Sequence, residues 1–410
     1  MLFHTLPTTP GQAAALARVS QLTDTRWTPV QDIPAFTIRS EKCWHKAGET
    51  VTGMPYSSPE PTDSFLIENY SLSTFFSALA NPDSVLYTKD LGGIRNSWTY
   101  IALVCNSLVR YAYGITRRYS TKRWLDIPGI RQVALPGAYT VEEIRLCDAL
   151  YAYGQGSNHV AIITDILRDQ DGKVAFVEVS EAIAPRCRKA LFTPEEYYVK
   201  YKLFGLTRYD YLDAVTMPEP ITFPEKPPVI SVDYGDRSNY FRGEPVVLSV
   251  FAEGPQQVLL TQENGPAETI TVTGKVSLHP EPGWYTAAHI ATGEAVRFCV
   301  CRPIIDYRVE DGVLHVNARS SDPKSRVAWL DLREGSRAKL SPDQIPLEER
   351  EKTQAPTAAG LAQVLELTEE EKTTGIFSRP LHPDARNFKV CYENPYGIWT
   401  HSMLPLEKEC

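Results

Sequence analysis

A proline-rich stretch near the middle of the chain most constrains how this protein can fold. Five prolines fall between Met217 and Pro228, a density that favours an extended, semi-rigid linker. Helix and strand patterns are mixed before this stretch, whereas almost every pattern after it is that of a strand. Because 410 residues are too many for one hydrophobic core, we expect a mixed domain over 1–216, a linker over 217–228 and β domains beyond.

The first β domain is predicted over 229–303. Gly, Pro and Asn turns separate its short apolar runs in the manner of a β-sandwich, the clearest runs being 246–251, 257–260 and 269–272. Tyr285 follows Gly283-Trp284 and resembles the tyrosine corner of an immunoglobulin-like fold. We therefore expect an immunoglobulin-like sandwich here.

A second β domain is predicted over 304–410. It closes with two apolar runs, 388–392 and 397–400, on either side of a turn at Asn394-Pro395. Residues of about 340–380 are instead charged and rich in Pro and Thr, a composition typical of solvated surface segments. The second domain is thus expected to be another immunoglobulin-like sandwich that carries a long charged insertion.

Cys105 stands at the start of a helix-like run over 105–114. A helix N-terminus lowers the pKa of a thiol because it presents unpaired N–H groups and the positive end of the macrodipole. His159 opens an apolar strand pattern over 159–165. An imidazole can take the thiol proton and later return it to a leaving group, while the backbone N–H of Cys105 supplies an oxyanion donor. The pair therefore predicts thiolate catalysis.

A third polar group must orient the imidazole, and two carboxylates are candidates. Residues 169–173 predict a hairpin turn after the strand that His159 opens, and 174–181 predict the returning strand. Glu178 and Glu181 both lie on that strand, three residues apart, so they occupy opposite faces of a regular strand.

The order of these motifs resembles that of the NlpC-type papain-like cysteine peptidases of bacterial cell-wall metabolism. In that family a G-x-P-Y segment precedes the helix that begins at the nucleophilic cysteine. A G-D strand, a G-H-V strand and a hairpin partner with the third catalytic residue then follow. The matching positions here are Tyr56, Cys105, Asp148, His159 and Glu178, spread over roughly the first half of the chain.

The resemblance implies an α+β papain-like N-terminal domain and an extracellular or cell-envelope enzyme. Its reaction is the hydrolysis of an amide bond in a peptidoglycan stem peptide, by an endopeptidase or amidase that uses a Cys105 thioester and no metal or other cofactor. The family's strand register makes Glu178 the third catalytic residue, with Glu181 as the alternative. It also brings the Tyr56 hydroxyl near the nucleophile. Asp148 is predicted to be a structural turn residue.

The residues around the nucleophile depart from the family pattern. Val104 replaces the usual Asp, Asn106 the usual Ser and Ser107 the usual Gly. In relatives that bind a free peptide amine, an acidic residue near this place helps to hold the amine. The long segment between Tyr56 and Cys105 further suggests an insertion that reshapes the cleft.

Two other functions remain open. The same site suits deamidation, transamidation or acyl transfer to another substrate. Alternatively, the protein is a non-catalytic adhesion or binding protein that uses its β-sandwich domains, and Cys105 is an inert core thiol. The expected ligand of the β domains is a glycan, a wall polymer or a protein.

Charge and composition exclude several classes of function. A net charge of −8 argues against a nucleic-acid partner, and no apolar run is long enough for a membrane span. The eight cysteines are scattered, unlike a disulfide framework. Cys43 and His45 have no second ligand pair, which favours packing over a metal site. After Thr9-Pro10, residues 11–22 predict a helix, and no clear export signal precedes it.

Overall fold

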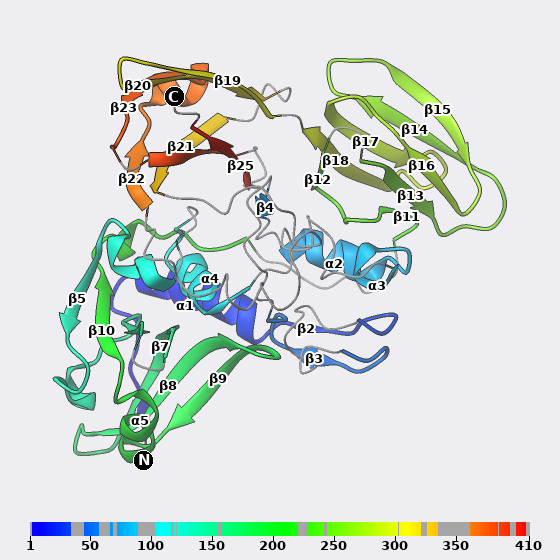
Figure 1. Ribbon diagram of the computed structural model, residues 1–410. Coiled ribbons are helices and arrows are strands. Elements are labelled where there is room, and N and C mark those ends of the chain that lie inside the picture. Colours follow the sequence, from blue (N-terminus) through cyan, green and yellow to red (C-terminus); the bar gives the residue numbers. More distant parts are fainter. Residues whose placement is uncertain are drawn as a thin grey trace, which may run out of the picture. The chain divides into compact units, whose positions relative to one another are not determined.

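Two units make up the chain in the computed structural model (Figure 1). The first comprises Met1–Pro29, Ala35–Ser58 and Ala102–Phe223, and the second comprises Val30–Pro34, Pro59–Ile101 and Pro224–Cys410. The structure describes residues 2–33, 45–56, 66–68, 72–88, 103–115, 119, 121–154, 157–219, 226, 228–241, 244–301, 303–320, 326–334, 361–383, 385–393 and 399–406.

An antiparallel sheet of seven strands forms the centre of the first unit. The strand order is β5-β10-β6-β7-β8-β9, and β1 pairs with the far end of β7. The bounds are β1 Phe3–His4, β5 Ile130–Ala134, β6 Ala149–Ala152, β7 His159–Arg168, β8 Val174–Ile183, β9 Arg186–Phe192 and β10 Gly205–Tyr209. The predicted strand at His159 and its returning hairpin partner are confirmed as β7 and β8.

Helices cover this sheet and place the thiol. They are α1 Pro10–Thr23, α4 Cys105–Ala112 and α5 Pro194–Tyr201, with the 3₁₀ helices η2 Thr121–Asp126, η3 Val141–Glu143 and η4 Leu212–Ala214. The predicted N-terminal helix is confirmed as α1, whose Thr9 cap accepts the Gln12 N–H. Helix α1 packs on α4, and α4 packs on β7 and β8. A two-stranded ribbon of β2 Arg26–Trp27 and β3 Val51–Thr52 completes the described part of the unit.

The first β part of the second unit contains two sheets. Three strands form one sheet in the order β11-β13-β16, and five form the other in the order β12-β18-β17-β14-β15. The bounds are β11 Ile230–Val232, β12 Ser238–Phe241, β13 Val246–Val250, β14 Gln256–Gln262, β15 Ala267–Val272, β16 Lys275–Leu278, β17 Gly283–His289 and β18 Ala295–Cys301. The Tyr285 hydroxyl donates to the Glu281 carbonyl at 2.8 Å, the local contact expected of a tyrosine corner.

The second β part also combines a sheet of three strands with a sheet of five. The orders are β19-β20-β23 and β22-β21-β24-β25-β4. The bounds are β19 Pro303–Glu310, β20 Val313–Ser320, β21 Arg326–Glu334, β22 Leu361–Glu366, β23 Ile376–Pro380, β24 Ala385–Glu393, β25 Trp399–Pro405 and β4 Leu66–Glu68. Buried residues of both sheets, including Leu314, Leu330, Phe377 and Phe388, form one core. The chain is thus rich in β structure, with two-layer arrangements after residue 228.

Part of the predicted charged insertion forms regular secondary structure. Residues 361–380 form β22, helix α7 (Glu369–Thr374) and β23, while 340–360 lie outside the described residues. Thr368 caps α7 in a capping box with Glu371, and Glu371 also accepts a hydrogen bond of 2.7 Å from Arg379. No residue of α7 is buried, so its charged side chains lie at the surface although some of them are paired.

Part of the predicted N-terminal domain belongs to the second unit. Strand β4 pairs with β25. Helices α2 (Leu72–Ala80) and α3 (Val85–Thr88) lie next to the first β part, where the Val85 N–H donates to the Asp233 carbonyl at 3.1 Å. The Asn81 amide likewise donates to the Val232 carbonyl at 3.1 Å. Residues 66–68 and 72–88, which lie between Tyr56 and Cys105 in the sequence, thus belong to the second unit.

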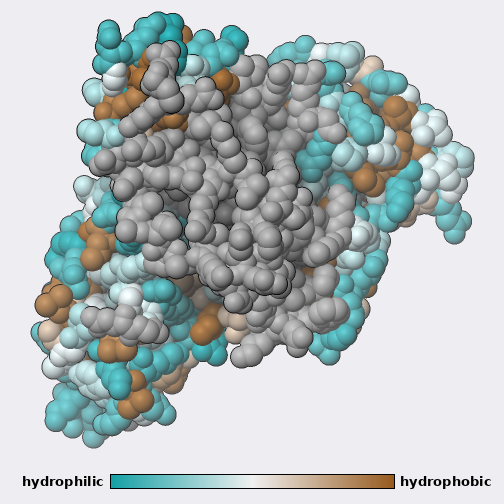
Figure 2. All heavy atoms as spheres, in the orientation of Figure 1, coloured by the Kyte–Doolittle hydropathy of each residue, from teal (hydrophilic) through white to brown (hydrophobic). Residues whose placement is uncertain are grey.

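The described surface is mixed in hydropathy. On the face drawn in Figure 2, hydrophobic residues form small groups among hydrophilic ones. Such scattered apolar side chains are ordinary on a protein surface. Among the described residues, no helix combines the length and the apolar character needed to cross a bilayer.

Candidate active site

Helix α4 places the Cys105 thiol at its first turn. Val104 is extended and ends the preceding loop, and its carbonyl accepts the N–H groups of Ser107 and Leu108. Its apolar side chain provides no cap, so it does not compete for the N–H groups that open the helix. Cys105 is only 8% exposed, against the sheet that α4 covers. The predicted position of this cysteine at a helix start is confirmed.

Three groups surround the sulfur of Cys105. The His159 side chain and the backbone of Val160 both act on the thiol and lower its pKa. The Thr121 hydroxyl, on η2, lies 3.7 Å from Sγ. The sequence pair Cys105 and His159 is therefore brought into contact by the packing of α4 on β7.

The His159 ring is held from several sides. Its Nε2 lies 3.0 Å from Oε2 of Glu181, which leaves Nδ1 for the thiol. The Phe204 ring meets the imidazole edge-on, with 6.1 Å between centroids and 87° between planes. A ring fixed in this way can pass a proton between sulfur and substrate without reorienting.

The partner of His159 is Glu181, so the first choice, Glu178, is wrong as the residue that contacts the imidazole. Glu178 instead accepts a hydrogen bond of 2.8 Å from the Thr164 hydroxyl. The register pairs Ile162 with Ser180, so Glu181 falls on the face of β8 next to the His159 side of β7. Alternation along a strand places Glu178 and Glu181 on opposite faces, but it does not indicate which face points toward the imidazole.

Glu181 is a buried carboxylate with several cationic partners. It is 1% exposed, and its Oε1 accepts from Arg188 Nη2 at 2.7 Å and from Lys200 Nζ at 2.8 Å. Burial alone would raise the pKa of Glu181, but the bonds to His159, Lys200 and Arg188 hold that pKa far below its usual range. The carboxylate is therefore ionised at neutral pH.

The electrostatics of the site favour a charge-separated pair. Burial opposes ionisation of Cys105, yet the hydrogen bond and charge of His159 bring the thiol pKa below its ordinary value. Burial likewise lowers the pKa of His159, but its bonds to Cys105 and Glu181 raise it to about 9. The two directions agree, and they describe a thiolate beside an imidazolium.

Sequence reasoning missed Thr121 as a neighbour of the nucleophile. The amide of Asn106 donates to the carbonyl of Tyr119 and so ties the segment before η2 to α4. In the sequence, Asn106 stands out only as a departure from the family pattern. Its packing role depends on a segment thirteen residues away, which no local pattern indicates.

Tyr56 lies beside the β8–β9 hairpin. Its backbone N–H donates to the carbonyl of Pro185 at 2.9 Å. Gly53, three residues earlier, has φ +90°, and a Cβ there would lie 2.1 Å from the carbonyl oxygen of Cys187. Only glycine therefore fits this close approach. The assisting role of the Tyr56 hydroxyl stays a prediction.

Asp148 forms a separate, structural ion pair. Its carboxylate accepts from Arg208 Nε and Nη2, both at 2.7 Å, and from the Arg145 N–H at 2.9 Å. The preceding Cys147 has φ 64°, at the turn that leads into β6. The position predicted to be a turn residue thus anchors β6 to β10.

The other candidate ligands do not form a metal site within the described residues. No group of three or more His, Cys, Asp and Glu side chains there is arranged to hold a metal ion. His45 packs edge-on against the Trp27 ring at 5.0 Å, while Cys43 lies outside the described residues. Cys299 is fully buried.

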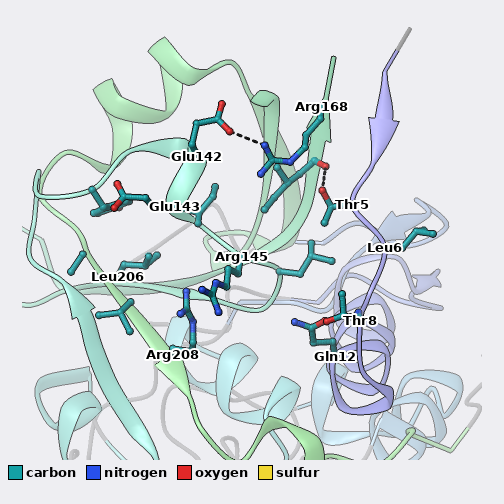
Figure 3. A pocket seen from close by; sticks show the side chains of 16 residues that line it. Thr5, Leu6, Thr8, Gln12, Glu142, Glu143, Arg145, Arg168, Leu206 and Arg208 are labelled. Carbon is teal, nitrogen blue, oxygen red and sulfur yellow. Dashed lines mark hydrogen bonds and ion pairs between the residues drawn. The ribbon is translucent and has the colours of Figure 1, made fainter. Parts of the chain in front are cut away.

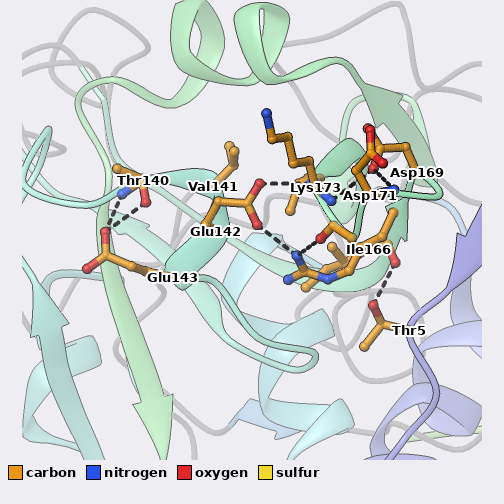
Figure 4. A network of polar contacts seen from close by, with 12 residues as sticks. Thr5, Thr140, Val141, Glu142, Glu143, Ile166, Asp169, Asp171 and Lys173 are labelled. Carbon is orange, nitrogen blue, oxygen red and sulfur yellow. Dashed lines mark hydrogen bonds and ion pairs between the residues drawn. The ribbon is translucent and has the colours of Figure 1, made fainter.

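A pocket of about 550 Å³ lies elsewhere in the first unit, beside η3 and the start of α1 (Figure 3). Its lining residues do not include Cys105, His159 or Glu181. Two of its arginines are engaged in ion pairs, Arg208 with Asp148 and Arg168 with Glu142. Glu142 also accepts the Val174 N–H in the network of Figure 4. This pocket is therefore separate from the thiol chemistry.

No protein-family model matches the chain, and no curated protein matches it. Among solved structures, the chain is similar to native alpha-2-macroglobulin of Escherichia coli spanning domains NIE-MG1, with 10% identity, 44% of this chain and 97% of that chain covered, and a TM-score of 0.16. The piece of the same protein spanning MG0-NIE-MG1 is 9% identical, with 68% of this chain and 95% of that chain covered and a TM-score of 0.17. Dimeric latent PorU from Porphyromonas gingivalis is also 9% identical, with 68% of this chain and 30% of that chain covered and a TM-score of 0.17. Likenesses with TM-scores this low carry no argument about fold or function.

Proposed function

We propose that the first unit is an NlpC-type papain-like cysteine hydrolase that cleaves an amide bond. The observation that carries this proposal is that Glu181 holds the His159 imidazole, with 3.0 Å between Oε2 and Nε2, and that this imidazole lowers the pKa of the Cys105 thiol. A nucleophile, a base and a group that orients the base meet here at a helix start and on two neighbouring strands. These are the parts that thiol catalysis requires.

The reaction proceeds in two halves. The Cys105 thiolate attacks the amide carbonyl carbon, and the carbon–nitrogen bond breaks as His159 gives its proton to the departing amine. Water then attacks the thioester and loses a proton to His159. The carbon–sulfur bond breaks, the acid leaves and the thiolate returns. Glu181 stabilises the charged imidazole in both halves.

The oxyanion of each tetrahedral intermediate needs hydrogen-bond donors. Cys105 is the first residue of α4, and the side chain of the N-cap residue Val104 does not occupy the N–H groups of the first turn. The Thr121 hydroxyl lies 3.7 Å from the Cys105 sulfur. Both groups are fixed before substrate binds. Donors preorganised in this way make up a large part of the rate enhancement in acyl transfer.

The favoured substrate is a peptidoglycan stem peptide, because the motif order around Tyr56, Cys105 and His159 resembles that of cell-wall peptidases. The two β parts, taken as immunoglobulin-like sandwiches, would bind wall polymer, a glycan or a protein. They would hold the hydrolase near insoluble substrate. This arrangement corresponds to an extracellular or envelope enzyme.

The test is incubation of purified wall fragments with the full chain and with the Cys105→Ala variant, followed by mass analysis of the products. We expect new amine and carboxyl termini with the wild type and intact fragments with the variant. A mass increase of one water per cut identifies hydrolysis. Wild type that leaves every fragment intact contradicts the wall-hydrolase assignment.

Acyl transfer is the second candidate, and Val104 favours it. The position where relatives carry an acidic residue near the substrate amine holds an apolar side chain here. The usual free-amine recognition is therefore lost, and the acyl group has a different destination or source. Adding glycine methyl ester to the same incubation distinguishes the two reactions. Products with the ester attached at the cut carbonyl identify transfer, whereas unlabelled acids identify hydrolysis.

A further inference from the structure

The two oxygens of Glu181 have different partners. Oε2 contacts the imidazole of His159 at 3.0 Å. Oε1 accepts three hydrogen bonds from two cations, namely Arg188 Nε at 3.1 Å, Arg188 Nη2 at 2.7 Å and Lys200 Nζ at 2.8 Å. One end of the carboxylate is thus saturated by permanent charges, while the other is left for the titratable group.

The two cations come from different elements and are held in place. Arg188 lies on β9 directly opposite Glu181 in the β8–β9 register. Lys200 lies in the last turn of α5, and its ammonium group sits over the rings of Phe192 at 4.7 Å and Tyr201 at 5.0 Å. Strand pairing and cation–π contact therefore fix both donors independently of Glu181.

We propose that Arg188 and Lys200 are positioning residues of the Cys105 site, which hold the Glu181 carboxylate ionised and turned toward His159. The proposal rests on the proposed hydrolase function. It assigns a role in catalysis to two side chains that contact neither the sulfur nor the imidazole through any described bond.

The physical reason is the cost of a buried charge. Without the two cations, the ionised Glu181 would lose three charge-assisted hydrogen bonds while remaining 1% exposed. The carboxylate would then protonate at higher pH. A neutral carboxyl no longer stabilises the imidazolium, so the thiolate of Cys105 would also form only at higher pH.

The titratable and charged groups around Glu181 come from four elements. They are His159 on β7, Arg188 on β9, Lys200 and Tyr201 on α5, and, beyond the imidazole, Cys105 on α4. Burial raises the pKa of Tyr201, so its hydroxyl stays neutral across the working range. The pH response of the carboxylate therefore depends on the imidazole and the two cations.

The experiment measures the alkylation rate of Cys105 by iodoacetamide from pH 4 to pH 10 in the full chain, with Cys105→Ala as the blank. The variants are Arg188→Met, Lys200→Met and the double variant. Lys200→Arg restores charge and donors, and Lys202→Met removes a lysine at the end of the same helix as a matched control. Folding of each variant is checked by circular dichroism.

In the double variant, we expect the onset of alkylation to shift about one pH unit higher. At a pH near the onset, this shift makes alkylation about tenfold slower than in the wild type. The single variants shift less, Lys200→Arg behaves like the wild type, and Lys202→Met does not shift. Folded Arg188→Met and Lys200→Met variants with the wild-type curve overturn the proposal. If the double variant does not fold, the contrast of Lys200→Met with Lys200→Arg decides.

Cleavage of wall fragments is scored on the same samples. If the alkylation curve of the wild type shows a lowered thiol pKa and the variants shift it, but wall fragments stay intact, the proposed substrate is contradicted and the positioning role is kept. If the wild type cleaves the fragments but the variants have the same alkylation curve as the wild type, only the positioning role is contradicted. A wild-type thiol that titrates as a free cysteine overturns both.

Discussion

Two thiols in the first unit each lie near a buried carboxylate, and only one of the two pairs includes an imidazole. Cys105 is linked through His159 to Glu181, whereas Cys147 directly precedes Asp148. Both carboxylates are 1% exposed and ion-paired. Burial and ion pairing therefore do not distinguish the carboxylate of the proposed active site from a structural one.

The difference lies in what the carboxylate oxygens face. Asp148 has both oxygens bound by the guanidinium of Arg208, and burial still raises its pKa. Glu181 keeps one oxygen for an imidazole, and its cations hold its pKa low. Accordingly, burial and the Asp148 charge raise the pKa of Cys147 to about 12, while the pKa of Cys105 falls. A buried carboxylate contributes to proton transfer only when a titratable group occupies one of its oxygens.

The largest expected effect is the difference in reactivity between the two thiols. At pH 7 Cys105 should react with iodoacetamide on the order of 10³ times faster than Cys147, because the pKa of the Cys105 thiol is lowered and that of the Cys147 thiol is raised to about 12. Peptide mapping after a short pulse measures both sites in one sample. Equal labelling of the two cysteines would remove the basis of the comparison.

Asp148→Asn should destabilise the fold by about 3 kcal/mol, since it leaves the Arg208 charge without its buried partner. Urea unfolding followed by tryptophan fluorescence measures the loss. The pH curve of Cys105 alkylation should stay unchanged, because Asp148 contacts neither Cys105 nor His159 through a described bond. A shifted curve would mean that the two regions are coupled.

Glu181→Gln should instead lower wall-fragment cleavage by about 10²-fold, because a neutral amide does not stabilise the imidazolium. Glu178→Gln is the matched control on the opposite face of β8, where the partner is the Thr164 hydroxyl. Initial rates of product formation compare the two variants. A larger loss with Glu178→Gln would reverse the assignment that the structure makes.

The pH dependence of cleavage should be bell-shaped. Below the lowered pKa of Cys105 the thiol is protonated, and above about 9 the imidazolium of His159 loses the proton that it gives to the leaving amine. Each limb falls about tenfold per pH unit. Initial rates from pH 4 to pH 11 at saturating substrate test this, and a rate that still rises above pH 10 would exclude the imidazolium as the acid.

Thr121→Val should have the smallest effect, a two- to fivefold slower alkylation of Cys105, which is about 0.5–1 kcal/mol for one weak hydrogen bond. Thr121→Ser keeps the hydroxyl and should behave like the wild type. Stopped assays at pH 6 are sensitive enough for this change. Identical rates in the Val and Ser variants would show that the hydroxyl does not interact with the thiolate.

Local patterns predicted much of the first unit. The Thr9 cap, the turn over 169–173 and the apolar run after His159 each stabilise structure through neighbouring residues, so they can be recognised in the sequence. The start of α4 at Cys105 belongs to the same class. Contacts between distant segments were not predictable in this way. Strand β4, for example, pairs with β25 more than three hundred residues later.

The sequence by itself determined the chemical inventory of this protein: a thiol at a helix start, a histidine at a strand start and two carboxylates on the returning strand. Only the tertiary structure decided that Glu181 faces the histidine, that Thr121 reaches the sulfur, and that Arg188 and Lys200 hold the carboxylate. The reason is that capping and turns depend on neighbours in sequence. Strand register and the docking of η2 and α5 depend on packing between segments far apart in the chain.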